Sequence, residues 1–476
     1  MKIRKLRFLS HCFPVIILLL PFIASGQQKY WTLKDCIEYA LENNVAYKQQ
    51  KLVSEISKIN LDQSKMNRLP NLSFSDAQSF SFGNSVNSSS YTVNHQNTNS
   101  NLPALNSTVV LFNGMKYANL VKENNYNYES SQLDIETQKN NLELSITAAY
   151  EQVLFENEVV SIAQQQIVSD SIEIKRTELF VAVGQTPEDS LLVLQAQMAA
   201  DKSAKVTAET QVVLAYVQLS QLMEKPISMD FRIEIPANNE PSPDLILNAA
   251  DVYNTAASIF PDEKSAALKT KASETDLLVT KSALLPSLSL TGGLSSEYYS
   301  ALSKYSSVYQ NEVIGYLQNT SQPVIGPIVN TTTQPYPFFN QFKDNFSQVI
   351  ALSLSVPIFN NYKAQNNIRL SKIAVLNARL NEQAVKNNLR KNVETACANQ
   401  LAGSKNYVAT KEQLVAETKA YENMKRKYNV GLANITDYLI EQNNYFRALM
   451  ANLQSKYTYV FQTKVVNFYT GTSLIQ

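Results

Sequence analysis

The stretch that decides the fold is KYNVGLANITDYL, residues 427–439, which lies between two long runs of helix-forming residues. Gly431 can adopt the left-handed backbone conformation that ends a helix. Asn434 can cap the following helix, and Asp437 favours the positive end of that helix's dipole. The stretch therefore predicts a sharp reversal between two helices.

A second reversal lies upstream, in VGQTPEDSL at residues 183–191. Gly184 takes the place of Gly431 there, Thr186 is the predicted cap, and Pro187 is predicted to be the first helical residue. Asp189 supplies the acid of a capping-box-like pair. Two such turns in one chain indicate a duplicated helical hairpin.

The duplication extends well beyond the turns. Three pairs of residues that occupy matching places in the two halves are each 247 positions apart: Phe112 and Phe359, Lys139 and Lys386, and Val183 and Val430. A constant shift over this length predicts that both halves fold alike.

Residues 1–26 are organised like an export signal. Basic residues among the first seven are followed by an apolar run from Phe13 to Ile23 and by the small residues Ala24-Ser25-Gly26. The apolar run is about half of the roughly 20 residues that a membrane-spanning helix needs, which disfavours an anchor. We expect cleavage before Gln27 and an exported mature chain.

The composition argues against several classes of protein. The formal net charge is +1, without the basic excess expected of a nucleic-acid-binding protein. Only Cys36 and Cys397 follow the signal, too few for a disulfide scaffold, and the sequence leaves open whether they pair. No later segment is apolar enough for a transmembrane helix, so we expect any membrane crossing to be a β-barrel. Without a catalytic motif, a phosphate-binding loop or a metal-ligand cluster, we expect no enzyme, no cofactor and no metal.

Each repeat is predicted to contain a helix, two strands, a long helix, the reversal and a last helix. The first repeat, 27–225, has its strands at about 71–83 and 101–112, its long helix at 115–182 and its last helix at 187–224. The second repeat, 245–476, follows a linker at 226–244 and has its strands at about 287–298 and 346–359, its long helix at 362–429 and its last helix at 434–470. The opening helices are predicted to end near 67 and 284, and polar loops to cover 83–100 and 299–345.

The strands alternate between apolar and small polar residues. Leu72, Phe74 and Phe80 alternate with serines in the first strand, and Ile350 and Leu352 do so in the last. Such alternation is typical of a barrel wall with a wet lumen, although a soluble sandwich with one solvated face has the same pattern. Because each strand pair is flanked by helices of about 100 Å, too long to cover it, we favour the barrel. Membrane barrels begin at about eight strands, so a chain with four must either oligomerise or lay its strands on something else.

These residues together resemble the TolC-like outer-membrane efflux protein family. The resemblance rests on Leu-Pro before each first strand, on Phe112-Asn113-Gly114 and Phe359-Asn360 after the second strands, and on both Val-Gly turns. It covers nearly all of the mature chain. It implies an α+β membrane protein in which internally duplicated helical hairpins form a tunnel and three copies form a twelve-stranded barrel in the outer membrane. It also implies an equatorial belt made by the chain start, the linker and the tail near Gly471.

The resemblance further implies partners and a function. The homotrimer would extend from outer-membrane lipid into the periplasm of a Gram-negative bacterium and would meet a periplasmic adaptor and an inner-membrane transporter. It would serve as the exit duct of a tripartite efflux pump. The alternatives are a type I secretion channel for proteins or peptides, and a soluble periplasmic coiled-coil adaptor or structural protein. An adaptor is disfavoured because strand pairs lie between the helices twice.

Family resemblance places adaptor docking and gating at the two reversals. The candidate docking residues are Val183, Gly184, Val430, Gly431 and Leu432, and the candidate gate residues are Tyr428, Asp437, Glu188 and Asp189. Glu188 and Asp189 have a sufficient simpler explanation, since acids are common in the first turn of a helix. For Asp437 the two explanations are balanced. Three copies around a narrow lumen would repel one another, raise their pKa values and select cations.

Overall fold

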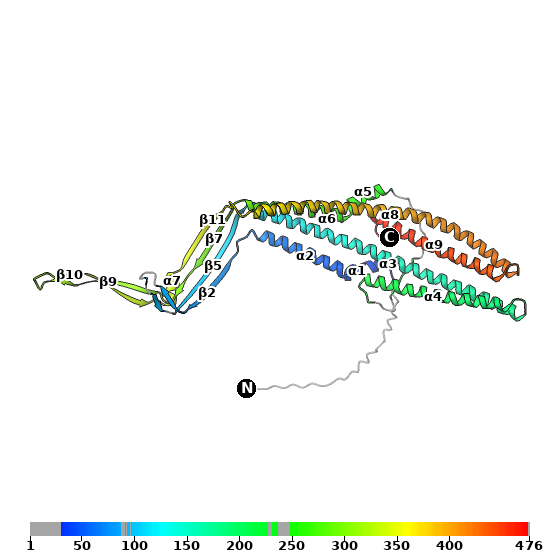
Figure 1. The fold of residues 1–476 in the computed structure, drawn as a ribbon, viewed down its shortest axis with the longest axis horizontal. Helices are drawn as coiled ribbons and strands as arrows, with labels where there is room; N and C mark the ends of the chain where they lie inside the picture. The colour runs from blue at the N-terminus through cyan, green and yellow to red at the C-terminus, as the bar shows by residue number, and fades with distance from the viewer. Residues whose placement is uncertain are drawn as a thin grey trace, which may run out of the picture.

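The computed structural model describes residues 30–86, 91, 93–95, 97–226, 231–236 and 248–474. The molecule is a long rod of helices with a sheet at one end and both helix reversals at the other (Figure 1). The expected export signal, residues 1–26, lies outside the described residues, and so does most of the linker at 226–244.

Two long helices run the length of the rod. Helix α3 spans Lys116–Ala182 and helix α8 spans Lys363–Asn429, and each has 67 residues, or about 100 Å. Helix α4, Glu188–Leu222, and helix α9, Ile435–Tyr469, run back from the reversals with 35 residues each. The four helices therefore form two hairpins of matching dimensions.

The opening helix of each repeat is broken, where the sequence predicted a continuous helix. The pieces are α1, Leu33–Asn43, and α2, Val45–Met66, in the first repeat, and α5, Ala249–Ile259, α6, Pro261–Lys281, and the short η1, Ser282–Leu284, in the second. Asn44 leaves the helical conformation, and its side chain accepts a hydrogen bond from the Tyr47 amide at 3.0 Å, which starts α2 afresh. Phe260 is extended because Pro261, the first residue of α6, disfavours a helical residue before it.

The helices form a layer with two open edges. Near the sheet, α2 packs on α3, α3 on α6 and α6 on α8, whereas near the reversals α4 packs on α3 and α9 on α8. Helices α2 and α4 thus follow each other along one side of α3, as the helix lengths predicted. Contacts between α3 and α9 join the two hairpins.

The sheet is antiparallel, with strands in the order β11-β7-β5-β2. The strands are β2, Ser73–Ser81, β5, Thr98–Asn113, β7, Ser287–Ser295, and β11, Ser347–Ser355, with the two-residue β8, Tyr298–Tyr299, beside β5. Val109, Leu290 and Leu352 lie opposite one another across three strands, so the apolar residues share a face. Every residue of the edge strands β2 and β11 is exposed in the single chain.

The outer connections contain more structure than the sequence predicted. The polar loop expected at 83–100 includes the paired strands β3, Asn84–Val86, and β4, Val93–His95. The loop expected at 299–345 was wrong, because it contains a hairpin of β9, Ser303–Tyr316, and β10, Pro323–Pro335, followed by α7, Phe338–Asp344. Figure 1 shows this hairpin projecting beyond the sheet. The last strand also stops at Ser355, before the expected end at 359.

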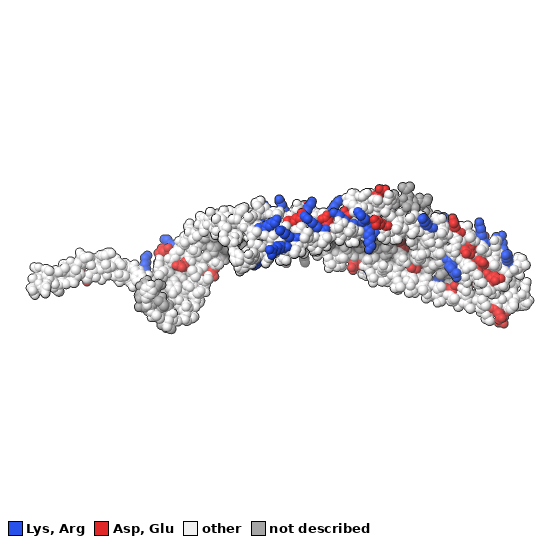
Figure 2. All heavy atoms as spheres, turned by 45° about the horizontal axis from the view of Figure 1, so that its top comes forward, with Lys and Arg blue, Asp and Glu red and all other residues white. Residues whose placement is uncertain are grey.

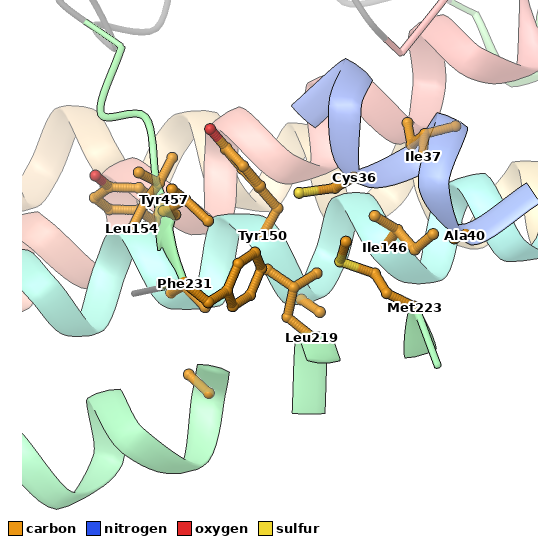
Figure 3. Packing of buried hydrophobic residues seen from close by; sticks show 14 of the residues in the cluster. Cys36, Ile37, Ala40, Ile146, Tyr150, Leu154, Leu219, Met223, Phe231 and Tyr457 are labelled. Atoms are coloured by element: carbon orange, nitrogen blue, oxygen red, sulfur yellow. The ribbon is translucent and has the colours of Figure 1, made fainter. Parts of the chain in front are cut away.

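The largest core cluster lies near the middle of the rod, where α1, α3 and α4 meet (Figure 3). Ile37, Ile146 and Leu219 are almost completely buried there. The Tyr150 hydroxyl donates a hydrogen bond to the Glu234 carbonyl oxygen at 2.7 Å. The short parallel pair of β1, Tyr30–Trp31, and β6, Arg232–Ile233, joins the start of the described chain to the described part of the linker.

The two cysteines do not form a disulfide with each other. Both are buried, but Cys36 belongs to the central cluster, whereas Cys397 belongs to a second cluster with Val393 and Val466. Within the described ranges, no helix combines the length and the apolar character needed to cross a membrane.

The passage from sheet to long helix is a tight left-handed corner in both repeats. Gly114 and Met115 have φ values of 62° and 65°, and Asn361 and Tyr362 have φ values of 54° and 59°. In the first corner, a β-carbon on Gly114 would lie only 2.7 Å from the Leu285 β-carbon. Glycine is therefore required there for two separate reasons.

Candidate docking and gating site

The two helix reversals lie at the same end of the rod (Figure 1). Gly184 and Gly431 have φ values of 71° and 76°. In each turn the glycine amide and the next amide donate to carbonyls of the last helical turn: Gly184 to Val181 at 3.0 Å, Gln185 to Phe180 at 2.9 Å, Gly431 to Tyr428 at 3.1 Å and Leu432 to Lys427 at 2.9 Å. This is the Schellman arrangement that ends a helix on a left-handed residue.

The two turns differ in how the next helix begins. The Asn434 side chain accepts a hydrogen bond from the Asp437 amide at 2.8 Å, which is the cap predicted from sequence. The prediction for the first turn was wrong: α4 begins at Glu188, Pro187 is the residue before it, and no side chain caps the helix. Pro187 lacks an N–H and is held extended, so the chain enters the helix one residue later than expected.

Large apolar side chains project from both turns. Val183, Val430 and Leu432 are 73%, 70% and 78% exposed. A β-carbon on Gly184 or Gly431 would meet no atom within 4 Å, so the backbone is open to a partner. Exposed apolar groups gathered at the end of a rod are typical of a protein interaction site.

A groove of about 650 Å³ separates the two turns. Phe180, Gln185 and Pro187 line it from the first turn, and Tyr428, Asn429 and Ala433 line it from the second. Of the candidate docking residues, Val430 and Gly431 line this groove, whereas Val183, Gly184 and Leu432 lie outside its lining.

Arg176 of α3 bridges the two hairpins beside this groove. Its Nη2 donates to the Asn429 carbonyl oxygen at 2.7 Å, and its Nη1 donates to the Asn429 side-chain oxygen. Glu173, which is buried, lies 3.8 Å from the same guanidinium. Sequence reasoning missed this link, because the residue equivalent to Arg176 in the second repeat is Asn423, which cannot make it.

We expect Arg176→Ala to loosen the second turn. Losing a two-pronged guanidinium contact, partly screened by solvent, should speed amide hydrogen exchange at residues 429–435 roughly tenfold. Hydrogen-exchange mass spectrometry measures this effect. The exposed neighbour Lys175 provides the matched control, Lys175→Ala, and equal exchange in the two variants would contradict a bridging role.

An aromatic cluster supports the second turn from within. The ring of Tyr428, a candidate gate residue, stacks on Tyr438 with centroids 4.8 Å apart. Tyr438 is fully buried, and its hydroxyl lies 3.0 Å from that of Tyr421. Burial, followed by the Tyr421 hydrogen bond, raises the pKa of Tyr438 far above its usual range. Tyr428 therefore helps to fix the turn in the single chain.

The candidate acids are all exposed at the starts of helices. Glu188 and Asp189 lie in the first turn of α4, and Asp437 lies in the first turn of α9. Each is placed to interact favourably with a helix N-terminus. Their arrangement in one chain fits the simple electrostatic explanation, and their role in a gate stays a prediction.

Comparison with known proteins identifies the fold. The description of the family model that matches residues 252–471 is "Outer membrane efflux protein". Comparison with curated protein sequences gives no match. Among solved structures, the Campylobacter jejuni CmeC outer membrane channel is similar with a TM-score of 0.72 and 18% identity, over 92% of this chain and 85% of that chain.

Two further outer membrane proteins have the same fold. The outer membrane protein VceC of Vibrio cholerae matches with a TM-score of 0.74 and 13% identity, over 93% of this chain and 96% of that one. The open state of the Neisseria gonorrhoeae MtrE outer membrane channel matches with a TM-score of 0.72 and 18% identity, over 93% and 89%. The second half of the chain therefore matches the outer membrane efflux protein family, and its first half repeats the same layout of helices and strands.

Proposed function

We propose that the chain is the outer-membrane exit duct of a tripartite efflux pump, through which small molecules pass from an inner-membrane transporter and a periplasmic adaptor to the exterior. The observation that carries the proposal is the pair of open edges. The sheet ends in β2 and β11, which have no further partner strand among the described residues, and the helical layer ends in α2 and α4 on one side and in α8 on the other.

Open edges of this kind favour a closed ring of copies. Apolar side chains are exposed along both edges of the helical layer, on α2 and on α8: Leu52, Ile56, Ile59, Leu370, Ile373 and Leu380. Joining one edge to the opposite edge of the next copy is a head-to-tail contact, which closes into a ring when the rotation permits. Four strands from each of three copies would make the twelve-stranded barrel of the expected homotrimer.

The surface supports a division between lipid and periplasm. Charged side chains gather over the helices on the face in Figure 2 and are sparse over the sheet. Phe74, Phe80 and Leu352 are exposed on the sheet. An outward apolar band on tilted strands is what outer-membrane lipid requires. The sheet would therefore lie in the outer membrane and the helices would extend into the periplasm.

Channel recording tests the duct directly. Protein purified in detergent should insert into planar lipid bilayers and give discrete conductance steps, and chemical cross-linking should stop at three copies. Protein that is fully extracted in buffer alone and gives no steps would exclude a duct and favour a soluble adaptor. The same recordings on Asp437→Asn test the gate, since a ring of carboxylates should favour cations and its loss should remove that preference.

We expect the triple variant Val183→Ser, Val430→Ser, Leu432→Ser to lose adaptor binding while it still inserts into bilayers. These three side chains are the most exposed apolar groups of the two turns, and removing them should lower the yield of adaptor cross-links about tenfold. The cross-linking partner is a purified periplasmic adaptor protein. Val408→Ser, an exposed change on α8 away from the turns, is the control. Unchanged cross-linking by the triple variant would place docking elsewhere.

A further inference from the structure

Two aspartates are buried together between α3 and α4, on the reversal side of the rod. Asp170 is 1% exposed and Asp201 is 8% exposed. The Asp170 carboxyl lies close enough to that of Asp201 for a hydrogen bond between them to influence its ionisation. Burying two carboxylates side by side is costly unless their charge is reduced, because neither desolvation nor mutual repulsion is compensated.

Three glutamine amides surround the pair. Gln442 of α9 donates to Asp170 Oδ1 at 2.9 Å. Gln166 of α3 donates to Asp201 Oδ1 at 2.8 Å, and Gln197 of α4 donates to Asp201 Oδ2 at 3.0 Å. Three of the four carboxyl oxygens are therefore each supplied with one donor, by three separate side chains.

The fourth oxygen lacks a donor. Asp170 Oδ2 is buried and has no hydrogen-bond partner among the described residues. A proton placed on one of the facing carboxyls satisfies this oxygen and removes one of the two charges at the same time. A metal ion would fit less well, because the amides present N–H groups to the pair, and the described residues contain no group of three metal-ligating side chains.

Other titratable groups near the pair come from α3, α8 and α9. On α3, Glu173 lies one turn from Asp170 and interacts with Arg176 at 3.8 Å. Tyr438 is on α9 and Tyr421 on α8, and Tyr421 is linked to α3 by its hydroxyl, 3.3 Å from the Ser169 hydroxyl. Burial, followed by the hydrogen bond with Tyr421, raises the pKa of Tyr438 far above its usual range, so Tyr438 stays neutral at physiological pH.

We propose that Asp170 and Asp201 hold one proton between them, and that this shared proton locks the first hairpin, α3–α4, both internally and against α9 of the second hairpin. The proton closes the contact between α3 and α4. The hydrogen bond from Gln442 to Asp170 links the same pair of aspartates to α9, so the contact between the two repeats also depends on the shared proton. Loss of the proton leaves two buried carboxylates facing each other and weakens both contacts.

The direction of the pH effect follows from the pKa. Burial, followed by interactions with Asp201, raises the pKa of Asp170 from 3.8 to about 7. In an unfolded chain the group ionises near 3.8, so its stabilising contribution is complete below that pH and is lost as the pH rises through about 7. The contacts among α3, α4 and α9 should therefore loosen in neutral to alkaline solution.

Asp170→Asn tests the shared proton, because asparagine is nearly isosteric and supplies a permanent donor to Asp201. Hydrogen-exchange mass spectrometry at acidic and alkaline pH, corrected for intrinsic exchange, should show protection around residues 166–174 and 438–445 of the wild-type protein falling about tenfold or more on raising the pH. Asp170→Asn should abolish that fall. Infrared difference spectra of the wild-type protein should show the carbonyl band of a protonated carboxyl that titrates near neutral pH. The spectra of Asp170→Asn should lack this band.

Two further variants make the result decisive. Glu123 of α3 has a pKa raised to about 7 by burial and then by Asp276, near the sheet, so Glu123→Gln should leave the pH dependence around residue 170 unchanged. Asp201→Asn is the reciprocal variant, and it should also abolish the fall in protection. It takes the place of Asp170→Asn in the experiment if the Asp170→Asn protein does not fold. A wild-type pH dependence retained in a folded Asp→Asn variant would overturn the proposal. Because no transport partner is needed, the outcome is independent of the proposed duct.

Discussion

Replacing Tyr438 with alanine is expected to unfold the end of the rod that carries the two reversals, while leaving its middle intact. Tyr438 is the largest fully buried side chain, and it is packed among Ile174, Leu194 and Leu439 from three helices. Removing a buried aromatic ring costs about 4 kcal/mol through lost burial and the cavity left behind. The Tyr428 ring would also lose its stacking partner. Both reversals should consequently lose their fixed positions.

The local nature of this effect can be measured directly. Hydrogen exchange reports on the reversals, whereas the fluorescence of Trp31, the single tryptophan of the chain, reports on the central core. Tyr438→Phe is the matched control, because it keeps the ring and loses only the hydroxyl contact with Tyr421, worth about 1 kcal/mol. If both variants are affected equally, the hydrogen bond rather than ring packing holds the turn.

Gly114→Ala is expected to destabilise the junction between sheet and helix by about 3 kcal/mol, from left-handed strain and overpacking together. The added β-carbon would lie 2.7 Å from the Leu285 β-carbon, and that atom cannot move away without moving its backbone. The residue would also have to keep a φ of 62°. Urea unfolding in detergent, followed by circular dichroism, measures the change in the free energy of unfolding.

Gly184→Ala separates the two causes. Gly184 has a similar φ of 71°, but nothing lies within 4 Å of the new β-carbon, so only the left-handed strain of about 1 kcal/mol remains. Gly114→Asn is a second comparison, since the equivalent residue of the other repeat is Asn361 with a φ of 54°. Equal losses for Gly114→Ala and Gly184→Ala would show that Leu285 moves aside at little cost.

The sequence predicts the parts of this fold that depend on local periodicity. The alternation from Leu72 to Phe82 follows from the pleat of a strand. Helix α3 follows from a stretch without glycine or proline, and α8 from a stretch whose single glycine is Gly403. The β9–β10 hairpin escaped prediction because apolar residues occur on both of its faces. Tyr305 and Tyr309 lie on one face and Val308 lies on the other, so the sequence shows no simple alternation.

The candidate site was predictable in place but not in its internal contacts. The positions of the two reversals can be predicted from the Val-Gly pairs, because a left-handed glycine and a helix cap are signals in the local sequence. Arg176 and Asn429 are separated by 253 residues, and Asp170 and Gln442 by 272. Such contacts depend on how two helical hairpins pack side by side, and the spacing of residues along one helix contains no information about that packing.

The left-handed corners at Gly114–Met115 and Asn361–Tyr362 also explain how the outer connections can differ so much between the repeats. The backbone itself fixes the bend, with four positive φ values, and both long helices start two residues after Gly114 and Asn361. One repeat carries the short β3–β4 connection and the other the long β9–β10 hairpin, yet the helices beyond them have equal lengths. The conformation of the helical rod therefore does not depend on the outer connections. Segments can be inserted or grafted into these connections without altering the end of the molecule that carries the two reversals.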